Sequence, residues 1–184
     1  MIIPPAVVPN SACYRETEIL HYGEPGNDFQ TCYLTIPREC PSPAPVTVWF
    51  HGGGLTAGSK HIPSQLKNHG FAIAAVNYRL ASGGKTAKDA PNAGVKVTDC
   101  IEDAAAAVAW VYRNIASFGG DPKKIYLTGH SAGGYLTLMV GMAPKYLAPY
   151  GLSPADLAGL MPLSGHTITH FTERQQRNIS ILQP

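Results

Sequence analysis

The chain has 184 residues, of which 45% are hydrophobic and 14% charged, and its formal net charge is +2. This length and composition predict one globular domain over residues 1–184 with a sizeable core. Because no basic cluster exceeds Lys123-Lys124, nucleic acid is not expected as a partner. No apolar run approaches the length of a membrane span.

Residues 1–14 are predicted to form an extended arm. Their apolar run lacks a basic start and is broken by prolines, so it is a poor signal peptide, although it also fits a mature end left after signal removal. The compartment therefore stays open between cytoplasmic and secreted. The cysteines show no C-x-x-C spacing, which argues against a zinc site, and buried thiols are favoured over a Cys32–Cys40 disulfide. The four are Cys13, Cys32, Cys40 and Cys100.

The first half of the chain reads as strands separated by loops, with one helix. Strands over 16–22 and 29–36 flank strong turn residues and close a hairpin. Two later runs are continuous and apolar, as in buried strands. The remaining predictions for this half are a buried strand over 46–50, a surface helix over 60–68, a buried strand over 71–78 and a loop over 81–93.

The second half begins with the clearest helix, over 98–117, whose apolar residues follow a helical stripe until Gly119-Gly120 stops it. Strands alternating with helices predict a mainly parallel sheet with flanking helices, an α/β fold. The other predicted elements are a strand over 125–127, a helix over 135–142, an irregular stretch over 144–156, a buried strand over 157–164, and a polar tail over 165–184 with a helix near 172–177.

Ser131 is the candidate nucleophile. It lies in Gly129-His130-Ser131-Ala132-Gly133, which fits G-x-S-x-G between a predicted strand and a predicted helix. A serine at such a tight turn occupies an unfavourable backbone region, so the positions two residues either side must lack bulk. The turn presents the hydroxyl above the sheet, over the positive end of the following helix.

A second glycine motif, His51-Gly52-Gly53-Gly54, follows the strand predicted over 46–50. Three glycines after a buried strand let the backbone come close to a ligand and point N–H groups towards it. We expect His51 to orient this loop rather than to act in catalysis. Structural roles are also expected for Asp99 and Asp103 in the first turns of a helix, and for Tyr78 and Arg79 after a strand.

With both motifs placed, the chain resembles α/β-hydrolase carboxylesterases, most closely the hormone-sensitive-lipase-like and bacterial feruloyl-esterase-like branches. The resemblance implies that Ser131 is the nucleophile and that the backbone N–H groups of Gly53, Gly54 and Ala132 form the oxyanion hole. Preorganised donors of this kind contribute about 2.7–4 kcal/mol each to the stabilisation of the transition state. The resemblance also implies a small-molecule ester as substrate and a reaction that needs neither a metal nor an organic cofactor.

The resemblance also calls for an acid and then a base after the nucleophile. The acids after Ser131 are Asp156 and Glu173, and the histidines are His166 and His170. The stretch after Ser131 has room for one further strand, whereas the family pattern needs two or three, so we expect the chain to lack the C-terminal part of the fold. The strand over 157–164 then becomes a bare sheet edge, through which we expect self-association.

Three functions stay open at this point. The first is a serine esterase that cleaves small or aryl esters through an acyl-enzyme on Ser131. The second is an amide hydrolase of formamidase type, because the same site can cleave activated amides. The third is a non-catalytic hydrolase-fold fragment, which the missing acid and base favour and the two glycine motifs disfavour.

Overall fold

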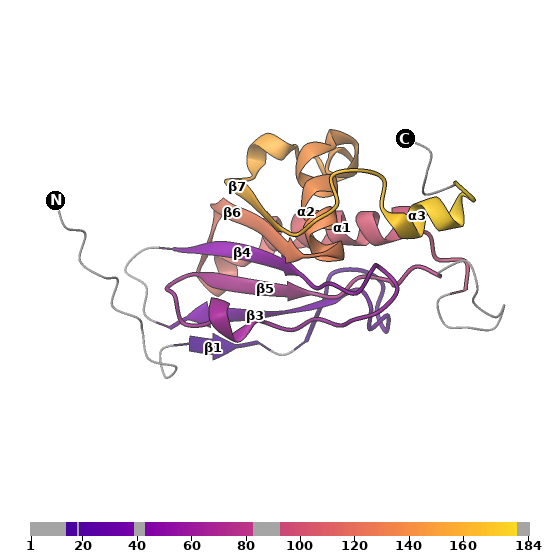
Figure 1. Cartoon of the computed structure of the whole chain (residues 1–184). Coiled ribbons are helices and arrows are strands. Elements are labelled where there is room, and N and C mark those ends of the chain that lie inside the picture. Colours follow the sequence, from indigo (N-terminus) through magenta and orange to yellow (C-terminus); the bar gives the residue numbers. More distant parts are fainter. Residues whose placement is uncertain (1–13, 18, 39–42, 83–92, 180–184) are drawn as a thin grey trace.

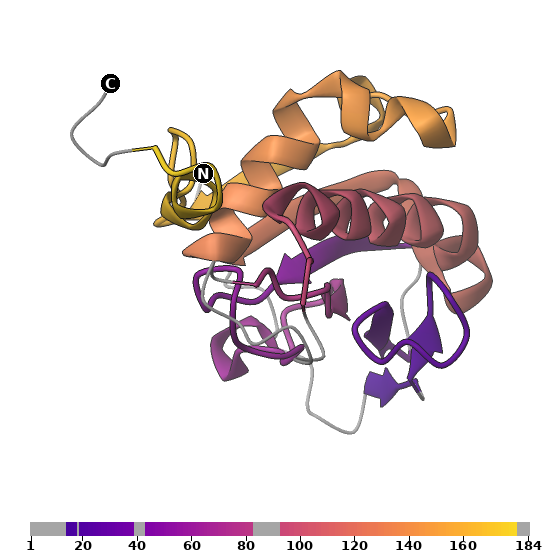
Figure 2. The same ribbon diagram turned by 90° about the vertical axis from the view of Figure 1, so that its right-hand side faces the viewer.

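The computed structural model describes residues 14–17, 19–38, 43–82 and 93–179. A twisted sheet carries helices α1 and α2 side by side on one face, and α3 lies near the end of the sheet towards which the parallel strands point (Figures 1 and 2). The elements are β1 (Tyr14–Glu16), β2 (Leu20–His21), β3 (Thr31–Pro37), β4 (Ala44–Phe50), β5 (Ala72–Val76), α1 (Val97–Asn114), β6 (Gly120–His130), α2 (Ala132–Met142), β7 (Gly159–Leu163) and α3 (Phe171–Gln176).

The strands form one sheet in the order β1-β3-β5-β4-β6-β7, with β2 also paired to β3. The four strands β5, β4, β6 and β7 are parallel to one another. The N-terminal strands β1 and β2 run antiparallel to β3, which itself runs antiparallel to β5. The α/β prediction is therefore confirmed for a mixed sheet, in which the strands expected to carry the site are the parallel ones.

The predicted strands are present in the structure, with ends that differ by a few residues. The prediction of a surface helix over 60–68 is wrong. That stretch holds only a short 3₁₀ turn, Ser64–Leu66. The backbone N–H of Lys60 donates to the side chain of Asn77, and its Nζ donates to Thr31 Oγ1 at 2.8 Å. These contacts fix the start of the segment against neighbouring strands, and Pro63 directly precedes the turn. The loop predicted over 81–93 and the arm over 1–14 lie almost entirely outside the described residues.

Each face of the sheet has its own core. On the helix face, α1 buries a run of small residues, including Ala104, Ala105 and Val108, so the helix can approach the strands closely. On the opposite face, Trp49 and Ile73 pack with Ile62, which belongs to the segment that was predicted to be helical. Burial of Ile62 in this second core is a further reason why the segment does not form a surface helix.

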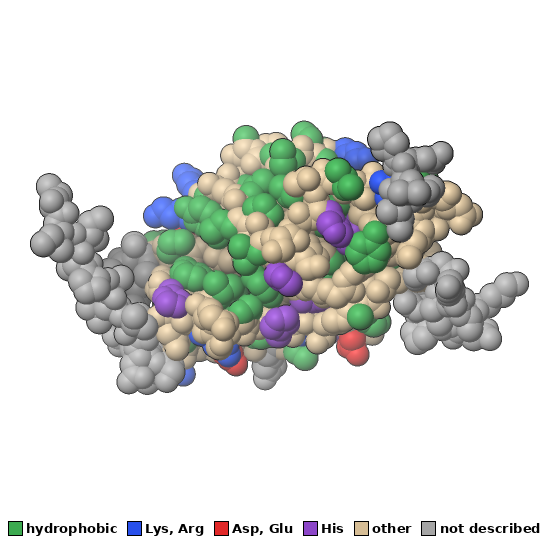
Figure 3. All heavy atoms as spheres, viewed as in Figure 1, with side chains coloured by type: hydrophobic (Ala, Val, Ile, Leu, Met, Phe, Trp, Pro, Cys, Tyr) green, Lys and Arg blue, Asp and Glu red, His purple; other side chains and the backbone are tan. Residues whose placement is uncertain are grey.

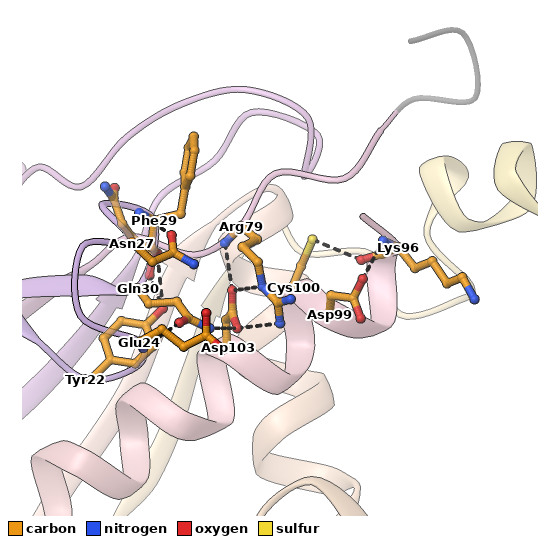
Figure 4. Close-up of polar contacts among 11 residues, drawn as sticks. Tyr22, Glu24, Asn27, Phe29, Gln30, Arg79, Lys96, Asp99, Cys100 and Asp103 are labelled. Atoms are coloured by element: carbon orange, nitrogen blue, oxygen red, sulfur yellow. Dashed lines mark hydrogen bonds and ion pairs between the residues drawn. The ribbon is translucent and has the colours of Figure 1, made fainter. Parts of the chain in front are cut away.

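Asp103 joins α1 to two segments that precede it in the chain (Figure 4). The carboxylate is buried and accepts hydrogen bonds from the backbone N–H of Arg79 at 2.9 Å, from Arg79 Nε and Nη2 at 2.8 Å each, and from Gln30 Nε2 at 2.8 Å. The side-chain hydrogen bonds from Arg79 to Asp103 raise the pKa of the Arg79 guanidinium. Asp103 is thus structural, as predicted, but through a buried ion pair rather than through the helix dipole.

The two cysteines in the described part of the chain, Cys32 and Cys100, are buried free thiols. Burial raises the pKa of each to about 12, so neither is a reactive thiolate near neutral pH. Cys13 and Cys40 lie outside the described residues. Among the helices that the structure describes, none has the length and apolar character needed to cross a membrane.

Candidate active site

Ser131 lies at the junction between β6 and α2, as the G-x-S-x-G motif predicts. Its φ of 55° and ψ of −113° place it in a region that non-glycine residues rarely adopt. Two hydrogen bonds hold this conformation: the Ser131 N–H donates to the Leu163 carbonyl at 2.8 Å, and the Tyr135 N–H donates to the Ser131 carbonyl at 3.0 Å. The turn is therefore secured both by β7 and by the first turn of α2.

The flanking glycines are required because β4 ends directly beneath the turn. A Cβ on Gly133 would lie 2.0 Å from the Phe50 carbonyl oxygen, and one on Gly129 would lie 2.6 Å from the same atom. On the other side, a Cβ on Gly134 would lie 2.9 Å from Gly165. All of these contacts are with backbone atoms, which cannot rotate away as a side chain can.

The glycine loop lies beside Ser131 because β4, which precedes it, pairs with β6. A Cβ on Gly52 would lie 3.5 Å from the Ser131 Cβ and 3.0 Å from the His130 carbonyl oxygen. Gly53 and Gly54 have φ values of 119° and 64°, both in the left-handed region that favours glycine. The structure thus brings the two predicted motifs together.

The carbonyls of this loop are engaged, which sets the direction of its amides. His51 Nδ1 contacts the Gly52 carbonyl oxygen at 2.8 Å, and the Gly53 carbonyl accepts from the N–H groups of Thr56 at 3.1 Å and Ala57 at 3.0 Å. A trans peptide places its C=O and N–H on opposite sides, so the Gly53 and Gly54 amides point away from those partners.

Within the described ranges, no residue accepts a hydrogen bond from the amides of Gly53, Gly54 or Ala132. Ala132 is the first residue of α2, where a helix leaves its N–H groups without intrahelical partners. Gly53 is exposed and Gly54 half-buried, whereas Ala132 is fully buried, so an oxyanion hole formed by these three amides stays a prediction.

The side chain of His51 is buried beneath the glycine loop. The ring is buried and stacks on Tyr78 with 4.3 Å between ring centroids, and the Tyr78 hydroxyl donates to the His51 carbonyl at 2.8 Å. Burial lowers the pKa of His51, so the imidazole is neutral and its Nδ1–H can donate to the Gly52 carbonyl. These contacts fit the orienting role predicted for His51 and the structural role predicted for Tyr78.

The two histidines after β7 lie in different environments. His170 is fully buried, and its Nδ1 accepts a hydrogen bond from the Thr172 N–H at 3.2 Å, which caps α3. His166 is exposed, and its ring centroid lies 4.9 Å from that of His170. His170 lies in the loop before α3, and its ring is packed between His166, Tyr135 and Phe171.

Both downstream acids have other partners. Asp156 closes a capping box with Ser153 in the 3₁₀ turn Pro154–Asp156, before β7 begins. Glu173 accepts from the Tyr135 hydroxyl at 3.3 Å and contacts Arg177 Nη1 at 3.5 Å. No hydrogen bond or ion pair joins either carboxylate to a histidine in the described part of the chain. The structure therefore does not assemble an acid–base pair from these residues.

We expect His170 to make the folded protein less stable as the pH is lowered. Burial and then the nearby His166 lower its pKa to about 4, whereas the unfolded value is about 6.5. The unfolded state thus binds the proton more tightly, so stability that is present above about pH 6.5 is lost as the pH falls towards 4. Between about pH 7 and pH 4.5, the wild type should lose roughly 2–3 kcal/mol more unfolding free energy than His170→Asn, as measured by urea denaturation.

Asparagine keeps a side-chain acceptor at the helix N-cap but does not titrate in this range. His51 titrates in both proteins, so its contribution cancels from the comparison. Equal losses in wild type and variant would show that His170 does not carry the pH dependence.

The sequence reasoning missed the contacts of α3 with the glycine loop. Thr172 Oγ1 donates to the Gly54 carbonyl at 2.7 Å, and a Cβ on Gly54 would lie 3.0 Å from Phe171 Cζ. Thr172 is fully buried although it lies in a stretch that reads as a polar tail. No local pattern indicates this contact, because its partners are 118 positions apart.

The family model described as BD-FAE matches residues 33–179, which is most of the chain. A phenmedipham hydrolase of Pseudarthrobacter oxydans is 32% identical over 162 residues, covering 83% of this chain and 31% of that protein. Both glycine motifs lie within the residues that the family model covers.

Two solved structures share the fold. Esterase B from Lactobacillus rhamnosis has a TM-score of 0.62 at 23% identity, covering 80% of this chain and 48% of that chain. Brefeldin A esterase, described as a bacterial homologue of human hormone-sensitive lipase, has a TM-score of 0.61 at 20% identity, covering 88% and 42%. These likenesses confirm an α/β-hydrolase fold. The chain spans less than half of each of these proteins.

Proposed function

The chain belongs to the BD-FAE family, and from this premise we propose that it carries the nucleophile and oxyanion site of a serine carboxylesterase. The observation that carries the proposal is the strained φ of 55° at Ser131, held between β6 and α2 beside the glycine loop. Strain of this kind costs free energy and persists where the surrounding structure imposes it, often at functional sites.

In the proposed reaction, the Ser131 hydroxyl oxygen attacks the carbonyl carbon of an ester. The oxygen of the tetrahedral intermediate accepts hydrogen bonds from the amides of Gly53, Gly54 and Ala132, whose directions are set before substrate binds. The proton of the Ser131 hydroxyl passes through solvent water to the leaving alkoxide, so an alcohol departs and an acyl-enzyme remains on Ser131. A water molecule then attacks the acyl carbon, one of its protons returns to the Ser131 oxygen, and the acid is released. Each donor acts on charge that develops in the transition state, so its effect falls on the rate.

We place small or aryl esters first among the substrates. The rings of Tyr135, His166, His170 and Phe171 form one cluster, and Phe171 packs against Gly54 in the proposed oxyanion loop. An aromatic group on the ester would have ring faces and edges to contact there. We expect kcat/KM for p-nitrophenyl acetate to exceed that for an N-formyl aryl amide, whereas the reverse order would favour the formamidase-type function.

A second candidate is a non-catalytic chain that binds small ligands, since Asp156 and Glu173 are engaged elsewhere. Labelling with an alkyl fluorophosphonate separates the two, because the probe forms a covalent bond only with an activated nucleophile. Intact-mass and peptide analysis should find one adduct, on the peptide that holds Ser131. The exposed Ser117 serves as a matched control, so Ser117→Ala should retain the adduct and Ser131→Ala should lose it. An unlabelled wild type, or an adduct elsewhere, contradicts the proposed function.

We also propose a second copy of the chain as a partner of β7. This strand pairs only with β6 in the described sheet, and Met161 and Leu163 on it are 45% and 46% exposed. Figure 3 shows hydrophobic side chains gathered over the part of the face where β6 and β7 lie in Figure 1. Sedimentation velocity at micromolar concentration should show dimers or larger species, and Leu163→Lys should reduce them by placing a charge at the edge. A monomeric wild type would refute this pairing.

A further inference from the structure

Helix α3 is fastened to the glycine loop through Thr172. This side chain is fully buried, and its hydroxyl donates to the Gly54 carbonyl at 2.7 Å. The neighbouring Phe171 ring lies close enough that a Cβ on Gly54 would be 3.0 Å from its Cζ. The loop is thus held from above by two successive residues of α3, one through a hydrogen bond and one through packing.

With this contact, each of the three glycine carbonyls of the loop has a hydrogen-bond partner. The Gly52 carbonyl is contacted by His51 Nδ1, the Gly53 carbonyl accepts from Thr56 and Ala57, and the Gly54 carbonyl accepts from Thr172. Glycine has the widest conformational freedom of any residue, so a glycine loop keeps one shape only when its peptides are held. Along the backbone, the Gly54 amide lies between the Gly53 and Gly54 carbonyls, both of which accept hydrogen bonds.

Helix α3 is itself held by a cap at its start and by contacts with two other parts of the chain. At its start, the His170 ring caps the helix. In its middle, Glu173 accepts from Tyr135 on α2. Near its end, Gln176 donates to the carbonyls of Ser82 at 2.9 Å and Val95 at 3.0 Å, and its Oε1 accepts from the Val97 N–H at 3.1 Å.

We propose that Thr172 is a positioning residue that holds Gly54, and with it the oxyanion loop, in its ligand-ready conformation. Thr172 acts through the Gly54 carbonyl and touches no reacting atom. Its effect on catalysis rests on the proposed function, whereas its effect on the order of the loop does not.

The test compares Thr172→Val, which keeps the shape and removes the hydroxyl, with Thr172→Ser, which keeps the hydroxyl. Hydrogen–deuterium exchange is followed at the Thr56 and Ala57 amides, which donate to the Gly53 carbonyl and so report whether the loop turn is closed. We expect protection of these two amides to fall about threefold to tenfold in Thr172→Val, as for the loss of one hydrogen bond, and to return in Thr172→Ser.

The matched control is Thr35→Val. Thr35 is also buried, but its hydroxyl has no hydrogen-bond partner among the described residues, so the same chemical change should leave the loop unaffected. Unchanged protection in a folded Thr172→Val protein, equal to that of Thr35→Val, overturns the proposal. If Thr172→Val does not fold, Thr172→Ala takes its place, since it also removes the hydroxyl that donates to Gly54, and unchanged protection in a folded Thr172→Ala protein overturns the proposal equally.

A second readout links the loop to the reaction. With p-nitrophenyl acetate, Thr172→Val should lower kcat by roughly the same threefold to tenfold with little change in KM, because the oxyanion contacts form in the transition state. Thr172→Ser should restore kcat. A change in KM with kcat unaltered would overturn the positioning role. If wild-type Ser131 is not labelled by the fluorophosphonate, the proposed function fails, but the exchange data still decide whether Thr172 holds the loop.

Discussion

Replacing Ser131 with alanine is expected to lower the hydrolysis of p-nitrophenyl acetate by roughly 10²-fold or more, with the fold intact. The substitution removes the attacking oxygen, so no acyl-enzyme can form. Alanine also lacks the hydroxyl but leaves the hydrogen bonds that hold the turn, since these use only the Ser131 N–H and carbonyl. The measurement is steady-state kinetics on both proteins at the same concentration, with circular dichroism to compare their folds.

The pre-steady-state phase sharpens this result. A wild-type protein that acylates at Ser131 should release p-nitrophenol in an initial burst before the slower steady rate, and Ser131→Ala should show no burst. Buffer-catalysed hydrolysis, or hydrolysis by an unrelated surface group, would persist in the variant. If the two proteins hydrolyse the ester at the same rate, the esterase function fails for this polypeptide, whatever its fold.

The part of the site that could be predicted from sequence is marked by glycines that lie close together along the chain. Gly129 and Gly133 are spaced around Ser131 because backbone atoms of β4 and of the turn itself leave no room for a Cβ. The Phe50 carbonyl that excludes a Cβ lies far away in the sequence, but the glycines that answer it lie within five positions of one another, so they leave a readable pattern. The loop from His51 to Gly54 is readable for the same reason, as a glycine run directly after a buried strand.

The contacts that sequence reasoning missed depend on where distant segments meet. The Thr172 hydroxyl finds the Gly54 carbonyl only after β7 has brought the following chain back over the end of the sheet. The segment that begins at Lys60 has polar residues at helical spacing, yet its extended start is imposed by contacts with Asn77 and Thr31. In both cases the deciding partner lies elsewhere in the sequence, so local propensity carries no signal of it.

The largest loss of stability is expected for Gly133→Ala. The new Cβ would lie 2.0 Å from the Phe50 carbonyl oxygen and 2.9 Å from that of His51, so either β4 or the start of α2 must move. Those two elements are coupled through the β4–β6 pairing, and displacing them disturbs the centre of the sheet. We expect the free energy of unfolding to fall by at least about 4 kcal/mol, or the protein to be recovered only in aggregated form.

Gly141→Ala is the matched control, because Gly141 lies in the same helix and is also buried. The three atoms nearest to its Cβ would all be side-chain carbons of Leu160, the closest at 2.3 Å, and a flexible side chain can move aside. Alanine is also favoured over glycine within a helix by about 1 kcal/mol, which offsets part of the crowding. Urea denaturation should therefore show a much smaller loss for Gly141→Ala. Similar losses for both would mean that the approach of β4 to the turn does not dictate glycine at position 133, and the steric account of the G-x-S-x-G motif in this chain would be wrong.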